Sequence, residues 1–355
     1  MGIKRKIQLG VLIVFVLGFF FFFINIVVFV CLVIFSILFL SGILSFLLLN
    51  KKIKTTNAYK NNFIYTKQFV SNAGYRENIQ RNYEIVNLGS NPARFAFFYD
   101  GVLGQNWSTG TQGLDKDLEI LKYFHSYIKK DGIVLIPIVA FSSVSGYLKP
   151  ENDALQYVAK FVSILDPYQV NTMQGGLEAR RWINYPLFYN WKSIFWLFDD
   201  AEKDNRLAIL EQMMQPLELN MDALHWMKIW KDEFHITDLN APLPGELKEG
   251  REKSIKDLQN LIDFCLERSL KPILIFPPMS KYLSRLFSET ARETYIYSFI
   301  REANVKNIPF LDYFDDKRWS DENLYFNSFF LNLKGRKLFT QQVLKDLNSI
   351  ECNKE

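Results

Sequence analysis

The sequence predicts an α/β protein in which an open, doubly wound parallel sheet follows a membrane segment. Composition changes sharply near residue 54, and beyond residue 80 short apolar runs alternate with stretches of helical periodicity. Strands separated by helices are typical of a parallel sheet with helices on both faces. We therefore expect a membrane anchor at 1–54, a connector at 55–80 and an α/β domain at 81–355.

The anchor is an uninterrupted apolar run. No residue from Ile7 to Asn50 is charged, and Leu, Ile, Val and Phe dominate. About 44 residues at about 1.5 Å each form a helix roughly 65 Å long, about twice the thickness of a bilayer's hydrocarbon core. The length favours two spans joined by a turn near Asn25. A cleaved signal peptide is the alternative, but its apolar core is only about 7 to 15 residues long.

Basic residues flank the apolar run at both ends: Lys4, Arg5 and Lys6, then Lys51, Lys52 and Lys54. By the positive-inside rule, two spans leave both ends in the cytoplasm, whereas one span places the rest of the chain outside. The sequence therefore locates the protein in a cell membrane, with the lipid bilayer as a partner, and leaves the side of the α/β domain open.

Outside the anchor the chain is slightly acidic. The net charge of +4 includes the six basic residues of the first 54, so residues 55–355 carry about −2. A nucleic-acid-binding surface normally shows a basic excess, so nucleic acid is not an expected partner. The three cysteines form no CxxC pair, and His125, His225 and His235 lack ligand spacing. We therefore expect no metal site, cofactor or disulfide framework.

Four strands and four helices are expected in the α/β domain. The strands are apolar runs at 83–88, from 133 onward, at 271–278 and at 308–314. The helices show 3.6-residue periodicity at 113–130, 153–165, 254–270 and 333–347.

The pattern breaks between about 166 and 245, where aromatic residues are dense and clear strands are lacking. We interpret this stretch as a helical insertion that forms a local core. A lid over a cleft, or a surface lying on the membrane, is the alternative, because Trp and Tyr favour that interface.

Ligands of doubly wound sheets bind beyond the carboxyl ends of the strands. Gly89, Ser90 and Asn91 follow the first expected strand, and a tight turn there can present a serine nucleophile. Plain turn chemistry explains the same residues, because Gly, Ser, Asn and Pro all favour turns. Three acidic residues follow the fourth strand and either line the cleft or serve as turn residues: Asp312, Asp315 and Asp316.

This order of motifs, over roughly residues 80–348, resembles the SGNH or GDSL hydrolase superfamily. Within it, the chain resembles the membrane-anchored branch that includes the D-alanyl transfer protein of teichoic acids and polysaccharide O-acetyltransferase-like proteins. The resemblance implies a flavodoxin-like sheet and a nucleophile turn after the first strand. The stretch "GQNWSTGTQGLDKDLEILKYF" resembles the family's oxyanion block, with Asn106 and Gln112 as its polar members, and "FFLNLKGRKLFT" resembles the segment that opens the last helix.

The catalytic positions of that family are altered in this chain. Aligning "NLGSN" on Gly-x-Ser puts Asn91 at the nucleophile position. Aligning "NSFFLN" on Asp-x-x-His-Leu-Asn puts Asn327 at the acid and Phe330 at the base. Phenylalanine accepts no proton, and without a base the Ser90 hydroxyl is a weak nucleophile. His225 or His235 replaces the base only if the insertion folds over the site; otherwise they are surface or packing residues.

Two functions therefore stay open. The first is a membrane-anchored protein of bacterial cell-surface polysaccharide or teichoic-acid assembly with a degenerate triad, which binds a glycan, a lipid-linked intermediate or an acyl-carrier partner. Its pocket is formed by Gly89, Asn91, Asn106 and Gln112. The alternative is an active O-acyltransferase or esterase that uses Ser90 and an unrecognised base.

Overall fold

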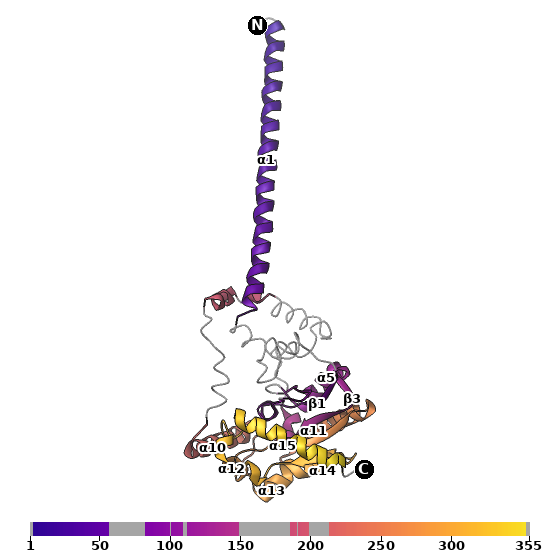
Figure 1. Cartoon of the computed structure of the whole chain (residues 1–355). Coiled ribbons are helices and arrows are strands. Elements are labelled where there is room, and N and C mark those ends of the chain that lie inside the picture. The colour runs from indigo at the N-terminus through magenta and orange to yellow at the C-terminus, as the bar shows by residue number, and fades with distance from the viewer. Residues whose placement is uncertain are drawn as a thin grey trace.

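The computed structural model describes residues 3–56, 82–99, 101–108, 112–148, 185–189, 191–198 and 213–352. A long helix, α1, precedes an α/β domain that contains the sheet and the other long helices among the described residues (Figure 1). The helix expected at 153–165 and most of the connector expected at 55–80 lie outside the described residues.

The sheet has five strands, all parallel, in the order β2-β1-β3-β4-β5. The strands are β1 (Tyr83–Asn87), β2 (Gly104–Asn106), β3 (Ile128–Pro137), β4 (Lys271–Phe276) and β5 (Phe310–Asp312). The predicted α/β class and parallel sheet are confirmed, and this strand order is the one found in flavodoxin-like sheets.

The sequence prediction missed β2 and placed the start of β3 too late. β2 pairs in register with β1, from Ile85 opposite Gly104 to Asn87 opposite Asn106. Three residues, two of them polar, carry no readable periodicity, so only the partner strand defines this one. β3 begins at Ile128 rather than near Ile133, because its first residues pair with the start of β1.

Helices cover both faces of the sheet, as expected for a doubly wound fold. On one face, α5 (Leu114–Phe124), α11 (Gly245–Glu267) and α14 (Ser298–Ala303) pack over Val86, Val134 and Leu274. On the other face, α15 (Leu333–Cys352) packs over Ile85, Leu135 and Ile273. Because successive strand residues point to opposite faces, neighbouring apolar side chains of a strand pack into two separate cores.

Short helical turns connect these elements. They are α4 (Asn91–Arg94), α12 (Lys281–Ser284), α13 (Glu289–Arg292), the π-helix η4 (Glu293–Tyr297), and the 3-10 helices η1 (His125–Tyr127), η2 (Ser142–Tyr147), η5 (Lys317–Trp319) and η6 (Glu322–Leu324).

The insertion expected at 166–245 is described in three pieces, and all three are helical. They are α8 (Pro186–Tyr189), the 3-10 helix η3 (Trp191–Leu197) and α10 (Pro216–Glu233). Ala223, Met227 and Trp230 of α10 join the core beside α5 and α11. This part of the insertion therefore belongs to the α/β domain, whereas α8 and η3 contact α1.

The N-terminal helix α1 (Ile3–Ile53) is continuous, so the turn expected near Asn25 does not occur in this structure (Figure 1). Neither proline nor glycine interrupts residues 19–41, and an uninterrupted helix satisfies every backbone group along that stretch without help from water. Its segment Gln8–Ile53 is long and apolar enough to cross a membrane.

Candidate functional site

The turn after β1 is shaped by Gly89. Its φ of 101° lies in the region that favours glycine, and a Cβ atom there would lie 3.0 Å from the Ala93 Cβ and from the Pro137 Cγ. Glycine therefore lets the chain turn tightly against the end of β3. The turn leads directly into α4, so Ser90 lies at the carboxyl edge of the sheet, as the sequence predicts.

Ser90 precedes α4 in the capping position, with φ −89° and ψ −159°, but its side chain does not cap the helix. Its carbonyl accepts a hydrogen bond from the Arg94 N–H at 2.9 Å. Within the described part of the chain, the half-buried hydroxyl makes no hydrogen bond, so the fold does not use it.

Asn106 holds the turn in place from β2. Its Nδ2 donates to the carbonyls of Arg94 (3.3 Å) and Phe97 (3.2 Å), and its Oδ1 accepts from Asn87 Nδ2 at 2.9 Å. Both Asn87 and Asn106 are buried. Because the Asn106 amide donates to the backbone at the end of α4, it positions the turn, whereas the sequence suggested a pocket-lining role.

A buried carboxyl lies beneath the turn, and sequence reasoning missed it. The Gly89 N–H donates to Asp117 Oδ1 at 2.8 Å, and the amide of Gln112 donates to the same oxygen. Gln112 also donates to the Trp107 carbonyl at 3.3 Å. Burial raises the pKa of Asp117 to about 7, against the two hydrogen bonds that lower it.

The only sequence signal for this group is a second acidic residue in the first turn of α5, after Asp115. Acidic residues are common at helix N-termini because they complement the helix dipole, so this signal does not distinguish a buried carboxyl from an exposed one.

The loop before α15 lies beside the turn after β1. The Phe330 ring stacks on Phe95 with centroids 4.7 Å apart and planes at 25°. Asn327 Oδ1 accepts hydrogen bonds from the N–H groups of Phe329 (2.9 Å) and Phe330 (2.7 Å), which fixes the loop. The structure thus places the expected base position, Phe330, beside the residue that follows α4, and the expected acid position, Asn327, in the same loop. One carries an amide engaged with the backbone and the other a hydrocarbon ring.

The three histidines make no described hydrogen bond to Ser90. His125 directly precedes β3, at the sheet edge opposite Ser90, and bonds the Lys122 carbonyl at 3.0 Å. His225 and His235 are exposed on and after α10, and the His235 ring packs edge-on against Tyr147. None of the described hydrogen bonds joins a histidine to Ser90.

The insertion helix α10 adds an aromatic wall to the site. The Trp226 ring lies 5.7 Å from Phe329 and 6.2 Å from Phe330, between centroids. Asp222, one turn earlier in α10, accepts hydrogen bonds from the N–H of Ser328 at 2.9 Å and from its hydroxyl. The half-buried Trp226 therefore extends the stacked rings of the loop toward solvent.

The three acidic residues after β5 are engaged locally. Asp312 accepts from the Tyr297 hydroxyl at 2.9 Å, Asp315 pairs with Arg292, and Asp316 caps η5. These contacts fit the turn interpretation. In the described ranges, no three His, Cys, Asp or Glu side chains gather as a metal site would require.

Two arginines lie close to the site. Arg336 of α15 is fully buried, and its Nη2 donates to the Phe97 carbonyl at 2.9 Å. Burial, together with the like charge of Arg94, lowers the pKa of Arg336 to about 9. The positive charge of Arg336 therefore lies against the backbone just after α4.

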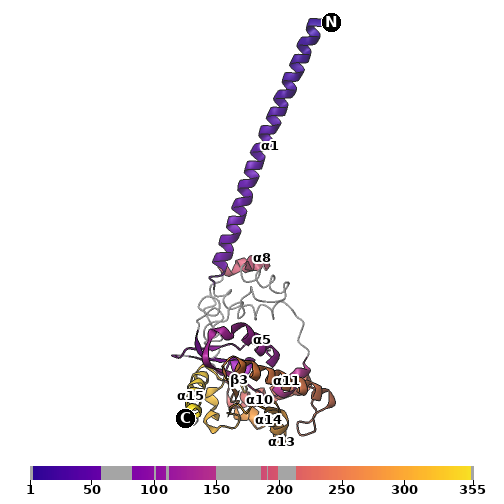
Figure 2. The ribbon, with the colours of Figure 1, turned by 90° about the vertical axis from the view of Figure 1, so that its right-hand side faces the viewer.

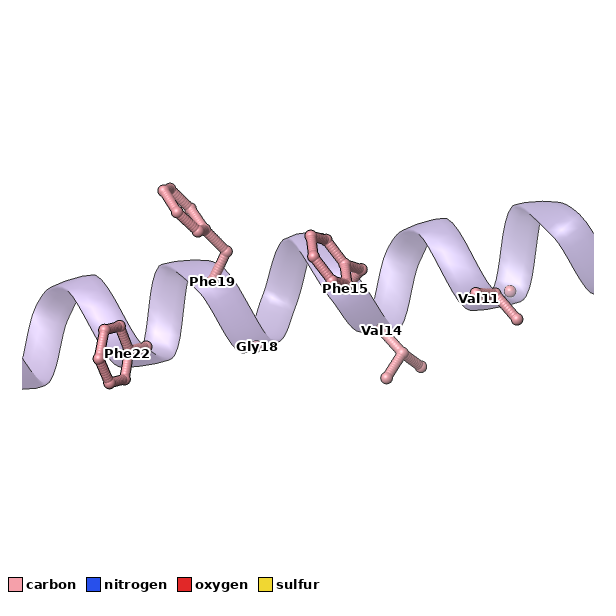
Figure 3. A pocket seen from close by; sticks show the side chains of 7 residues that line it. Val11, Val14, Phe15, Gly18, Phe19 and Phe22 are labelled. Atoms are coloured by element: carbon pink, nitrogen blue, oxygen red, sulfur yellow. The ribbon is translucent and has the colours of Figure 1, made fainter.

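The hollow drawn in Figure 3 lies on α1, away from this site. Gly10 and Gly18 have no side chains, and the remaining lining is apolar: Val11, Val14, Phe15, Phe19 and Phe22. It contains no group that transfers a proton or binds a charge, so it is not a candidate for chemistry.

Comparisons of the chain with protein-family models, curated proteins and solved structures found no match. The function is therefore argued from the site. It offers a serine hydroxyl and a wall of aromatic rings, over a buried layer of amides and one carboxyl, and it lacks a described base beside the hydroxyl. That combination suits binding, because pockets commonly join apolar walls to a few fixed polar groups.

Proposed function

We propose that this chain is a membrane-anchored, non-catalytic protein with an SGNH-like fold that binds a glycan or lipid-linked intermediate in bacterial cell-surface polysaccharide or teichoic-acid assembly. The single observation that carries the proposal is the stacking of Phe330 on Phe95, whose ring centroids lie 4.7 Å apart. The ring that the resemblance aligns with the family's base packs there against the residue that follows α4, and it offers no proton acceptor. Acid–base catalysis needs a titratable group within hydrogen-bond reach of the serine.

The surroundings of Ser90 support binding in place of catalysis. Trp226 and the stacked rings offer apolar faces, and one of these rings, Phe95, directly follows the short helix α4 that begins after Ser90. A sugar or polyol chain has both hydroxyl groups and apolar C–H faces, and a surface of rings and amides complements both. The long apolar helix α1 holds such a domain at the membrane, where these polymers are assembled.

Binding is tested with purified lipoteichoic acid and with capsular polysaccharide as probes, using the full chain in detergent. We expect binding of one of them, and Trp226→Ala weakens it several-fold because the substitution removes the outermost ring. The matched control is His225→Ala, an exposed neighbour on the same helix, which leaves the affinity unchanged. Failure of both polymers to bind contradicts the proposal.

A serine-dependent O-acyltransferase or esterase is the second candidate, because the Ser90 hydroxyl is half-buried at the turn and unused by the fold. A fluorophosphonate probe separates the two functions. The binding proposal predicts no covalent labelling of the full chain. Labelling that Ser90→Ala abolishes would establish the enzyme instead, and would require a base that moves to the turn on ligand binding.

A further inference from the structure

Residues 185–189 and 191–198 pack against the last turns of α1. In Figures 1 and 2, α8 lies across the lower end of α1, apart from the sheet. The Leu187 N–H donates to Asn50 Oδ1 at 3.0 Å, and the Tyr185 and Phe46 rings stack 5.9 Å apart. Ile53 is fully buried in a small cluster with Leu187, Trp196 and Leu197.

These contacts fix the segment at the point where the residues of α1 change from apolar to basic. The apolar run ends at Asn50, and the next residues are Lys51 and Lys52. Asn50 is buried, and its side chain bridges the two elements, since its Nδ2 also donates to the Phe46 carbonyl at 2.8 Å. In a membrane helix such a change from apolar to basic marks the boundary between hydrocarbon and head groups.

The other side of the segment is an exposed aromatic surface. Four large side chains are more than half exposed: Phe188 (67%), Trp191 (65%), Phe195 (56%) and Phe198 (82%). Within one fourteen-residue stretch this is a concentrated apolar patch, and a patch of this kind marks an interaction site. Trp191 and Phe195 pack edge-on at 6.0 Å, so two of the rings form one continuous surface.

We propose that residues 185–189 and 191–198, which we name the aromatic platform, lie in the head-group interface of the bilayer. Its occupant is lipid, because the platform is attached at the level where the apolar surface of α1 ends. Tyr and Trp at that depth match the aromatic belts of membrane proteins, and Lys51, Lys52 and Lys192 provide the basic charge that anionic head groups attract.

The platform gives the protein a second membrane contact besides α1. A single helix leaves the domain free to swing about its attachment, whereas an amphipathic segment in the interface plane restrains it. The inference rests on the membrane anchoring in the proposed function. It does not depend on whether Ser90 is catalytic or on which polymer binds.

The test uses the full chain in vesicles of phosphatidylcholine and phosphatidylglycerol, labelled with an environment-sensitive dye at single cysteines. Phe198→Cys and Phe188→Cys report on the platform, and Val305→Cys, an exposed apolar residue of the α/β domain, is the matched control. The background carries Cys31→Ser and Cys352→Ser. Buried Cys265 is retained, because burial raises the pKa of its thiol to about 12 and keeps it unreactive.

Brominated lipid chains should quench the dye at positions 198 and 188 several-fold more strongly than at 305, and aqueous iodide should quench in the opposite order. Equal exposure of all three sites to iodide overturns the proposal. Shielding of position 198 from both quenchers also overturns it, since that result means a protein surface covers the platform. Resistance of the vesicle-bound chain to an alkaline wash reports separately on anchoring by α1.

Discussion

At the scale of single residues, the turn that carries Ser90 depends on Asp117. The Gly89 N–H at the centre of the turn has this carboxyl as its acceptor, and the carboxyl is buried. Burial favours the protonated form, so the pKa rises from 3.8 to about 7. A protonated carboxyl still accepts the bond from Gly89, so the geometry of the turn does not require the charge.

This pKa predicts how the stability of the fold depends on pH. Because the native pKa exceeds the unfolded one, the native state holds an extra proton between about pH 4 and pH 7. The contribution of Asp117 to the free energy of unfolding is therefore most favourable below about pH 4, and it is lost as the pH rises through 7. The loss is up to about 4 kcal/mol. Asp117→Asn keeps the acceptor and removes the titration, so it should be more stable than the wild type at pH 8.

Denaturant unfolding of the full chain in detergent, at several pH values, measures this difference. Asp115→Asn is the control, because this half-buried neighbour only adds a like charge near Asp117. Its substitution should leave most of the decline in stability with rising pH in place. If Asp117→Asn loses stability equally at every pH, the carboxyl is not protonated in the native state at neutral pH.

The residue scale is also where sequence reasoning was weakest. It predicted the place of Ser90, because glycine, serine and proline after an apolar run are strong turn signals. It could not predict that the Asn106 amide donates hydrogen bonds to the backbone at the end of α4, or that Asp117 is buried. The first fact depends on β2, whose pairing with β1 no local pattern reveals, and the second depends on the packing of α5 against the turn after β1.

At the scale of elements, α15 docks through one glycine. A Cβ atom at Gly335 would lie 2.2 Å from the Leu324 carbonyl oxygen, which is backbone and cannot swing away. The same carbonyl accepts the Asn332 N–H at 2.9 Å, so the first turn of α15 and η6 are held together. The close approach of η6 to α15 therefore explains why the last residue of the "LNLKG" sequence is glycine.

Gly335→Ala should destabilise the fold by about 1–3 kcal/mol or more, since overpacking forces the backbone apart. Gly245→Ala, at the start of α11, is the matched control because nothing lies within 4 Å of its Cβ position. That control should leave stability unchanged or slightly raised, as alanine is the better helix former. Urea unfolding followed by tryptophan fluorescence compares them, and equal midpoints contradict the expected close contact.

The link between α10 and the loop before α15 is a second element-scale feature. Asp222→Ala removes the acceptor for the Ser328 N–H and hydroxyl, and should cost about 1–3 kcal/mol because buried donors lose their partner. It should also weaken ligand binding, because the loop loses its link to α10, the helix that carries Trp226. Met221→Ala, at the exposed neighbouring position, should change neither quantity. Unchanged unfolding of Asp222→Ala means that the loop holds its shape without α10.

Long periodic elements were the most predictable from the sequence. β4 and α15 begin where expected, because each buries a continuous or regularly spaced apolar face. α11 includes most of its expected range but begins at Gly245 rather than at Ser254. α10 was expected only as part of a helical insertion, and its place beside the loop depends on long-range contacts such as the one made by Asp222.

At the scale of the whole molecule, α1 is longer than one membrane crossing requires. Its 51 residues extend about 76 Å, whereas the hydrocarbon core is about 30 Å thick. A tilt of about 40°, the upper end of the usual range, still leaves a vertical extent of about 58 Å. One straight crossing therefore carries apolar helix beyond the bilayer core.

A continuous helix places the two ends of the chain on opposite sides of the membrane, whereas a hairpin returns them to the same side. The structure has no break in α1, so we expect opposite sides. Lys4→Cys and Lys345→Cys, each in a background of Cys31→Ser and Cys352→Ser, test this with an impermeant maleimide on intact cells. One of the two should react and the other only after lysis. If both react, or neither does, α1 bends into two spans in the bilayer, and the basic flanks at its two ends then face the same compartment.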